Sequence, residues 1–159
     1  MATNKHEIDQ INRSIVADVK LLYYPKVKAS ERPIIQRLQD AYNVFMEKWD
    51  MNNIYLVEEF KLMLLNRGNR VLGVVPISSG GMTGTVADPR VVFRYALLSG
   101  ATTIVICHNH PSENKQPSKA DENLTQKFKQ IGQLHDIHLM DHLIITGDGY
   151  LSMADEGML

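Results

Sequence analysis

Residues 102–121 read TTIVICHNHPSENKQPSKAD, and this stretch says most about the fold. Its first six residues are almost all apolar, which is typical of a central strand covered on both faces of a sheet. The loop that follows contains Pro111 and Pro117, and Ser118 is a favourable N-cap for a helix. The stretch therefore predicts a buried strand, then a polar loop, then a helix.

The segments on either side of this stretch alternate between extended and helical patterns. Apolar residues recur three or four positions apart in three segments, from Pro33 to Trp49, from Asp88 to Gly100 and from Ser118 to Leu134. Strand-like patterns cover residues 15–23, 54–65, 71–78 and 138–145, and a turn at residues 147–149 leads into a last short strand. We expect an α/β fold in which helices sandwich one mixed β-sheet, with a flexible segment at residues 1–13 and a single domain at residues 14–157.

Composition excludes several classes of protein. The chain has 159 residues, of which 44% are hydrophobic and 22% charged, as in ordinary soluble domains. The net charge of -1 provides no overall positive field for nucleic acid, so nucleic acid binding is possible only through a local contact. No apolar run approaches the ~20 residues that span a bilayer, and the first ten residues lack the apolar core of a signal peptide. With one cysteine, Cys107, and no disulfide, we expect a cytoplasmic protein with no membrane partner.

A set of metal-binding residue types follows the predicted central strand. His108 and His110 are two residues apart on an extended segment, so both side chains can point to the same side. Asp121 lies in the first turn of the next predicted helix, where the helix dipole favours a carboxylate. Two imidazoles and one carboxylate leave the fourth tetrahedral position of Zn²⁺ open, as in catalytic zinc sites. The spacing predicts one bound zinc ion per chain.

Each of these residues also has an ordinary structural interpretation. A lone histidine after a strand is usually a surface or hydrogen-bonded residue. Ser118 and Asp121 together form a variant of the capping box that begins many helices. Folding requirements alone rarely produce the whole combination, and the combination is what favours the metal site.

The combination His108-x-His110-Pro111, six residues, then Ser118-x-x-Asp121 resembles the motif of the JAMM metalloproteases, also called MPN+ or JAB proteins. The surroundings are similar to the bacterial RadC-like branch of that family, over roughly Ala17 to Gly157. The segments that carry this closer similarity are Glu58-Glu59-Phe60, Asn69-Arg70-Val71, Asp88-Pro89-Arg90 and the stretch from Leu139 to Ile145.

The resemblance implies a zinc-dependent hydrolase whose fold is related to that of cytidine deaminases. It assigns His108, His110 and Asp121 as the zinc ligands and Glu58 as the general base that deprotonates the attacking water. Ser118 would help to stabilise the oxyanion of the tetrahedral intermediate. The implied substrate is an extended polypeptide or an isopeptide.

Glu59 is an alternative general base, because strand alternation lets only one of two adjacent glutamates face the metal. Glu58 shares a face with Phe60, and Glu59 shares a face with Lys61. Lys61 is the most polar residue of that strand, which indicates that the Glu59 side is the wetter one. We therefore expect Glu58 to be the base.

Two further features bear on the family resemblance. Full-length members of the RadC-like branch carry an N-terminal helix-hairpin-helix region, and the roughly 50 residues before Ile54 are too short and too strand-like for one, so the branch's association with DNA repair transfers poorly. Asp141 and His142 recur in the branch and can lie behind the metal ligands, lie in the substrate groove, or form a satisfied pair at the end of a strand. Cys107 is expected to be an ordinary buried cysteine, and His135 and His138 to be surface residues.

Three functions remain open at this point. The first is a metal-dependent peptidase or isopeptidase. The second is a DNA-processing enzyme, which the string His108-Asn109-His110 brings to mind. HNH nucleases, however, do not place these three residue types consecutively, and the composition lacks the excess of basic residues expected of a DNA-binding protein. The third is a non-catalytic zinc-binding interaction module, which the intact set of ligands disfavours. Base deamination is disfavoured more firmly, because its His-x-Glu and Pro-Cys-x-x-Cys ligands are missing.

Overall fold

A five-stranded mixed sheet organises the residues that the computed structural model describes, which are 22–80 and 87–159. The helices are η1 (Ala29–Glu31, a 3-10 helix), α2 (Leu38–Met46), α3 (Pro89–Ser99) and α4 (Lys119–Leu134). The strands are β1 (Glu59–Leu65), β2 (Val71–Ser79), β3 (Thr103–Asn109), β4 (His138–Thr146) and β5 (Gly149–Ser152). No helix in these ranges is both long and apolar enough to cross a membrane.

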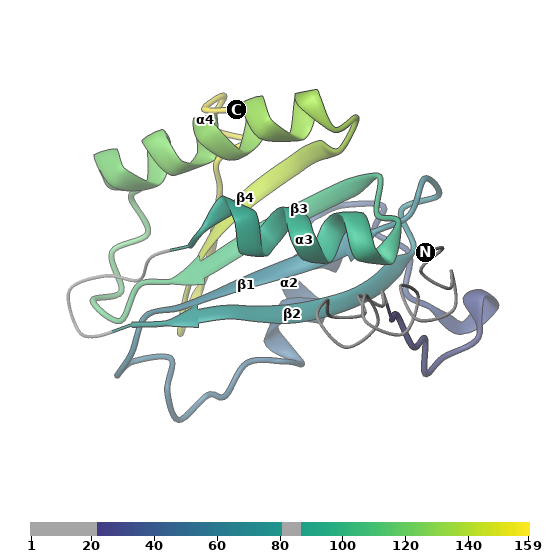
Figure 1. Cartoon of the computed structure of the whole chain (residues 1–159). Coiled ribbons are helices and arrows are strands. Elements are labelled where there is room, and N and C mark those ends of the chain that lie inside the picture. The colour runs from purple at the N-terminus through teal and green to yellow at the C-terminus, as the bar shows by residue number, and fades with distance from the viewer. Residues whose placement is uncertain (1–21, 81–86) are drawn as a thin grey trace, which may run out of the picture.

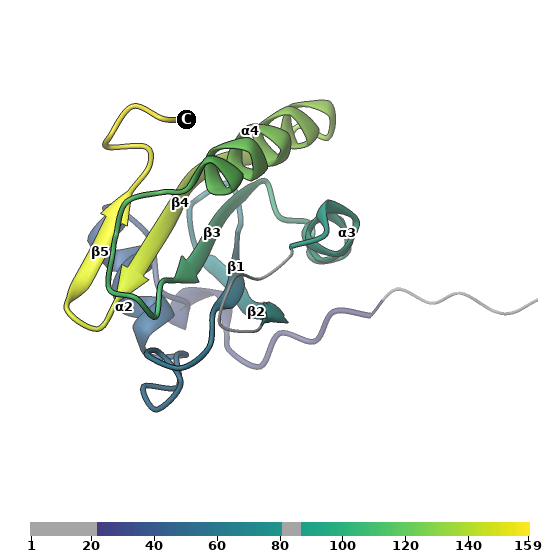
Figure 2. The ribbon, with the colours of Figure 1, turned by 90° about the vertical axis from the view of Figure 1, so that its left-hand side faces the viewer.

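The strand order is β2-β1-β3-β4-β5, with β3 in the middle. β1 runs antiparallel to β2 and β3, whereas β3 and β4 are parallel and are connected through α4. Helices α3 and α4 cover one face of the sheet and α2 covers the other (Figures 1 and 2). The predicted α/β fold, a mixed sheet sandwiched by helices, is therefore confirmed.

Strand alternation divides the core into two clusters, one on each face of the sheet. Phe60, Leu62 and Leu64 belong to the cluster under α3 and α4, and Met63 and Leu65 belong to the cluster under α2. All residues of β3 are buried, because β3 is covered on both faces as the apolar run predicted. Each fully buried leucine, isoleucine or phenylalanine contributes about 1.5–3 kcal/mol to folding.

Two predicted elements are shorter in the structure, and both begin later than expected. The strand predicted over residues 54–65 begins at Glu59, because turns occupy residues 51–56. Ile54 is nevertheless buried in the core under α2, so its apolar character reflects burial rather than a strand. The helix predicted from Pro33 to Trp49 is α2 alone, since Pro33 accepts a hydrogen bond from the amide of Val71 at the end of the sheet.

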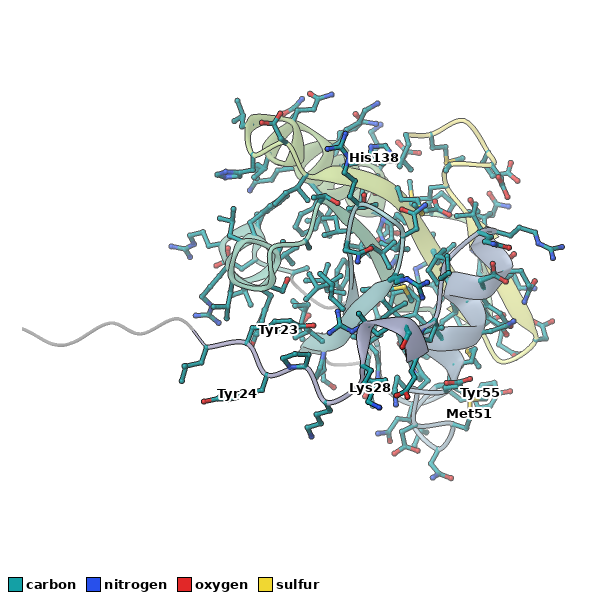
Figure 3. The ribbon with its side chains drawn as sticks, turned by 90° about the vertical axis from the view of Figure 1, so that its right-hand side faces the viewer. Tyr23, Tyr24, Lys28, Met51, Tyr55 and His138 are labelled. Carbon is teal, nitrogen blue, oxygen red and sulfur yellow. The ribbon has the colours of Figure 1, made fainter. Side chains whose placement is uncertain are left out.

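The predicted strand at residues 15–23 is not found where the structure can test it. Residues 15–21 lie outside the described residues, as does the predicted flexible segment at residues 1–13. Residues 22–24 are not in a strand, and Leu22 and Tyr24 are exposed. Figure 3 shows Tyr23 and Tyr24 on an arm along the side of the molecule, where the Tyr23 hydroxyl donates to the carbonyl of Leu72 at 2.8 Å.

Candidate metal centre

Three side chains from two elements converge where β3 ends. His108 is the second-last residue of β3, His110 is the first residue after that strand, and Asp121 is in the first turn of α4. Nε2 of His108 lies 2.9 Å from Nε2 of His110 and 3.3 Å from Oδ1 of Asp121. One potential ligand atom from each residue lies within 4.8 Å of the other two, so the group could hold a metal ion.

The hydrogen bonds around His110 determine which ring nitrogen carries its proton. Nδ1 of His110 lies 2.6 Å from the carbonyl oxygen of Asn114. A carbonyl can only accept, so Nδ1 donates, and in a neutral ring Nε2 is then left with a lone pair. The backbone amide of His110 donates to the carbonyl of Ile145 at 2.9 Å, which holds the residue at the end of β4.

His108 is held from behind by a second buried histidine. Its Nδ1 lies 2.8 Å from Nε2 of His142, and both side chains are at most 1% exposed. Burial, the main cause, and the charge of neighbouring His110 lower the pKa of His108 to about 4 despite the opposing effect of Asp121. His108 is therefore a neutral imidazole at physiological pH, which is the form that binds metal ions.

Asp121 directs one carboxylate oxygen towards the helix start and the other towards the histidines. Its Oδ2 accepts from the amide and the hydroxyl of Ser118, each at 2.6 Å. In return, the amide of Asp121 donates to Ser118 Oγ at 3.2 Å, which completes a capping box. The ordinary structural interpretation of Ser118 is thus observed, and Oδ1 of Asp121 remains directed at His108.

The electrostatics of this cluster favour a cation. When both rings carry their proton on Nδ1, the two Nε2 lone pairs lie 2.9 Å apart beside the Asp121 carboxylate, and they repel unless a positive charge lies between them. Two imidazoles and a carboxylate are a donor set typical of Zn²⁺, and three protein ligands leave a position open. The residues present therefore fit a metal ion.

The two candidate general bases lie on different faces of the sheet. The Glu59 carboxylate pairs with the ammonium group of Lys61 at 3.0 Å, beside the Trp49 ring. The carbonyl of Glu58 accepts from the amide of Gly80, so the β1–β2 ladder continues one residue beyond the strand. Position 58 then shares the face of Phe60, whose register partner is His108.

The premise that Lys61 marks a wet face of β1 is wrong. Lys61 is only 8% exposed, and its ammonium group donates to the carbonyl of Lys48 at 3.2 Å and lies 4.3 Å from the centre of the Trp49 ring. The long aliphatic stem of lysine lets it line the core under α2 while its charge is paired with Glu59. The shared face of Glu59 and Lys61 was predicted correctly, but not its burial.

Comparisons with known proteins identify the family of this chain. A family model described as the RadC-like JAB domain matches residues 35–158. The chain belongs to this family. It is 46% identical over 101 residues to a UPF0758 protein of Flavobacterium johnsoniae, an alignment that covers 64% of this chain and 44% of that protein. It is 39% identical over 102 residues to a UPF0758 protein of Syntrophotalea carbinolica, with 64% and 45% covered.

A UPF0758 protein of Clostridium novyi is 35% identical over 132 residues, which cover 83% of this chain and 57% of that protein. The chain thus spans about half the length of the relatives it matches. Membership of the RadC-like JAB family indicates a domain of the metal-dependent hydrolase type, and the names of these relatives state no activity.

In this RadC-like JAB domain, Asn109 joins the strand of the ligands to the segment of the candidate base. Its Oδ1 accepts from the amide of Glu59 at 2.7 Å, and its Nδ2 donates to the carbonyls of Ile54 and Val57 at 2.8 and 2.9 Å. The side chain is completely buried. Asn109 therefore holds the residues on both sides of Glu58 against the end of β3.

Asp141 and His142 have separate environments, although they are adjacent. His142 faces His108, whereas Asp141 accepts from the amides of His142 and Ala154 at 2.7 and 2.9 Å and lies away from the cluster. Burial raises the pKa of Asp141. Cys107 is buried on the face of α2, and burial raises the pKa of its thiol, so it behaves as an ordinary core cysteine. His135 and His138 are exposed, as expected.

Sequence reasoning missed Thr125, Asn109 and Asn114. Thr125 had a usable signal, because it lies four residues after Asp121 in a predicted helix and so on the same helix face. Asn109 and Asn114 act through hydrogen bonds to distant or turn backbone, which no local pattern reveals.

Proposed function

We propose that this domain is a zinc-dependent hydrolase that cleaves a peptide or isopeptide bond in an extended polypeptide. The observation that carries the proposal is the convergence of two Nε2 atoms and one carboxylate, whose ligand atoms all lie within 4.8 Å of one another. Zinc bound there would supply a Lewis acid, which lowers the pKa of a coordinated water to about 7. His108, His110 and Asp121 are the residues that would hold it.

In the proposed reaction, Glu58 takes up the proton of the attacking water and later gives it to the leaving amine. Its support is positional: by strand alternation position 58 shares the face of Phe60, the register partner of His108, while Glu59 is paired with Lys61. Ser118 is the proposed donor to the oxyanion of the tetrahedral intermediate. For that role its hydroxyl proton must leave Asp121 Oδ2, where it lies at 2.6 Å in the capping box.

The shape of the sheet next to the site supports a polypeptide substrate. β2 is the edge strand of the described sheet, and its C-terminal end, Ile77–Ser79, lies beside the start of β1. A surface pocket there is lined by residues of both strands, from Glu59 to Lys61 and from Pro76 to Ser79. An extended chain can add to such an edge through backbone hydrogen bonds, which brings its peptide bonds close to Glu58.

The first prediction concerns metal content. The purified protein should contain one equivalent of zinc per chain, and His110→Ala and Asp121→Ala should each lose it while the fold is largely retained, because each removes one of three ligands. Elemental analysis and circular dichroism measure the two properties.

A matched control is His138→Ala, which removes an exposed histidine at the far end of β4 (Figure 3) and should keep the zinc. Undiminished zinc in either ligand variant would refute the assignment.

Hydrolysis is tested on a peptide and isopeptide library, with the products identified by mass spectrometry. Cleavage should stop when a chelator is added and return when zinc is restored. Cleavage of DNA but of no peptide would favour the DNA-processing alternative.

A further inference from the structure

His142 is a fully buried titratable group next to the candidate metal centre, and the proposed reaction does not use it. Its ring is inaccessible to solvent and lies between His108 and Thr125. Nε2 of His142 is 2.8 Å from Nδ1 of His108, and its Nδ1 is 2.6 Å from Oγ1 of Thr125. Oγ1 of Thr125 is also 2.6 Å from the backbone carbonyl oxygen of Asp121.

The donors and acceptors can be assigned from the Asp121 end of this series of hydrogen bonds. A carbonyl oxygen only accepts, so the single hydroxyl proton of Thr125 points to Asp121, and Thr125 Oγ1 accepts from Nδ1 of His142. The sulfur of Met153, 3.5 Å from the hydroxyl, is a weaker acceptor and does not change this order. If the hydroxyl pointed to His142 instead, Oγ1 of Thr125 and the carbonyl oxygen of Asp121 would lie 2.6 Å apart with no proton between them.

This assignment then fixes which nitrogen of each histidine ring carries the proton. A neutral His142 with its proton on Nδ1 has a lone pair on Nε2, so His108 must donate from its own Nδ1. A neutral His108 with its proton on Nδ1 presents the lone pair of Nε2 to His110 and Asp121. The reverse order would put a proton on Nε2 of His108, where a metal ion could not bind.

We propose that Thr125 and His142 are positioning residues, which hold His108 in the tautomer whose Nε2 lone pair faces the metal cluster. The role of this tautomer in metal binding rests on the proposed function, whereas the tautomer itself does not. This order of hydrogen bonds needs neutral rings, and both rings are buried, with His108 1% exposed and His142 0% exposed. Phe60 closes the space beside them, with ring centres 6.1 Å from His108 and 5.7 Å from His142.

The test compares Thr125→Val with Thr125→Ser. Valine keeps the shape of threonine but removes the hydroxyl, and serine keeps the hydroxyl. In metal-free protein at about pH 8, above the ordinary histidine pKa, long-range ¹H–¹⁵N NMR identifies the protonated nitrogen of each ring. We expect Nδ1 protonation of both His108 and His142 in the wild type and in Thr125→Ser, and a shift of His108 towards Nε2 protonation in Thr125→Val.

Zinc affinity is measured on the same proteins by competition with a chelator. We expect Thr125→Val to bind zinc about 10–100-fold more weakly, the usual effect of losing a group that orients a ligand, and Thr125→Ser to bind it within a few-fold of the wild type. A merely structural role would lower the melting temperature of the metal-free protein without changing the tautomer.

The outcomes separate this inference from the proposed function. Nε2 protonation of His108 in the wild type overturns the inference, and so do unchanged tautomers and unchanged zinc affinity in Thr125→Val. If Thr125→Val does not fold, the wild-type spectrum alone decides. A wild type that shows the expected tautomers but binds no zinc supports the inference and refutes the proposed function.

Discussion

Adjacent glutamates at the start of β1 allow the proposed general base to be tested by one matched pair of substitutions. Glu58→Gln should keep zinc but lower the rate of hydrolysis by at least ~100-fold, the scale of general-base catalysis, because the amide cannot accept the proton of the attacking water. Steady-state rates on a peptide substrate, with elemental analysis of the same sample, measure both properties.

Glu59→Gln is the control, since its side chain is paired with Lys61 on the opposite face of the sheet. It should change the rate little but lower the free energy of unfolding by about 1–3 kcal/mol, because the buried Lys61 ammonium loses its charged partner. If the two variants exchange these effects, Glu59 and not Glu58 is the general base, although the assignment of the metal ligands is unaffected.

The single residues of the site differ in how far sequence could reveal them. His108, His110 and Asp121 follow a fixed spacing around one loop, so the sequence placed them together, as the structure does. The sequence did not decide among three roles for His142, because its contact with His108 depends on the parallel pairing of β3 and β4, which brings together residues 34 positions apart. Asn109 contacts backbone 50 to 55 residues away, and no periodicity encodes such a contact.

At the scale of the element, Ser118 links the start of α4 to the metal cluster. Ser118→Ala removes the hydrogen bond from Ser118 Oγ to Asp121 Oδ2 and the acceptor for the Asp121 amide. It should cost about 0.5–2 kcal/mol of stability, as for other lost helix caps, and should lower turnover by a larger free energy if the hydroxyl also serves the oxyanion. Chemical denaturation and steady-state kinetics give the two values.

Ser118→Thr retains a hydroxyl and a good cap, and it should recover most of the stability and part of the turnover. A clear drop in melting temperature in Ser118→Ala with an unchanged rate would leave Ser118 as a cap alone.

Whole elements were predicted well where one sequence signal agreed with tertiary packing. α3 has its Asp88 N-cap, Pro89 in its first turn and Gly100 at its end with a φ of 67°, and all three signals are local. The ends of β1 and α2 were misplaced because Ile54 and Ile35 are buried without being in a strand or helix. Their burial comes from Asn109 and from backbone bonds to residues 69–71, which are distant in sequence.

At the scale of the whole molecule, the metal cluster lies where the sheet meets α4, and the rings of His108 and His142 are buried there as neutral groups. Burial lowers the pKa of His108 to about 4 and that of His142 well below 6.5. On acidification the unfolded chain therefore takes up protons that the folded chain does not. The stability from these neutral rings is present above pH 6.5 and is lost as the pH falls towards the folded-state pKa values.

The metal-free protein should accordingly lose stability between about pH 7 and pH 5, by about 2 kcal/mol from His108 alone and by more once His142 is included. Asp141, whose pKa burial raises, opposes this loss because it takes up a proton more readily in the folded chain.

Urea denaturation of chelator-treated wild type at the two pH values gives the total loss of stability, and His142→Gln removes one of the two buried rings while leaving the Asp141 side chain in place. The variant should therefore lose less stability than the wild type over the same interval, whereas the exposed control His138→Gln should match the wild type. Equal losses in wild type and His142→Gln would mean that the ring is not held neutral by the fold, and would also remove the electrostatic basis for a cluster of lone pairs that attracts a cation.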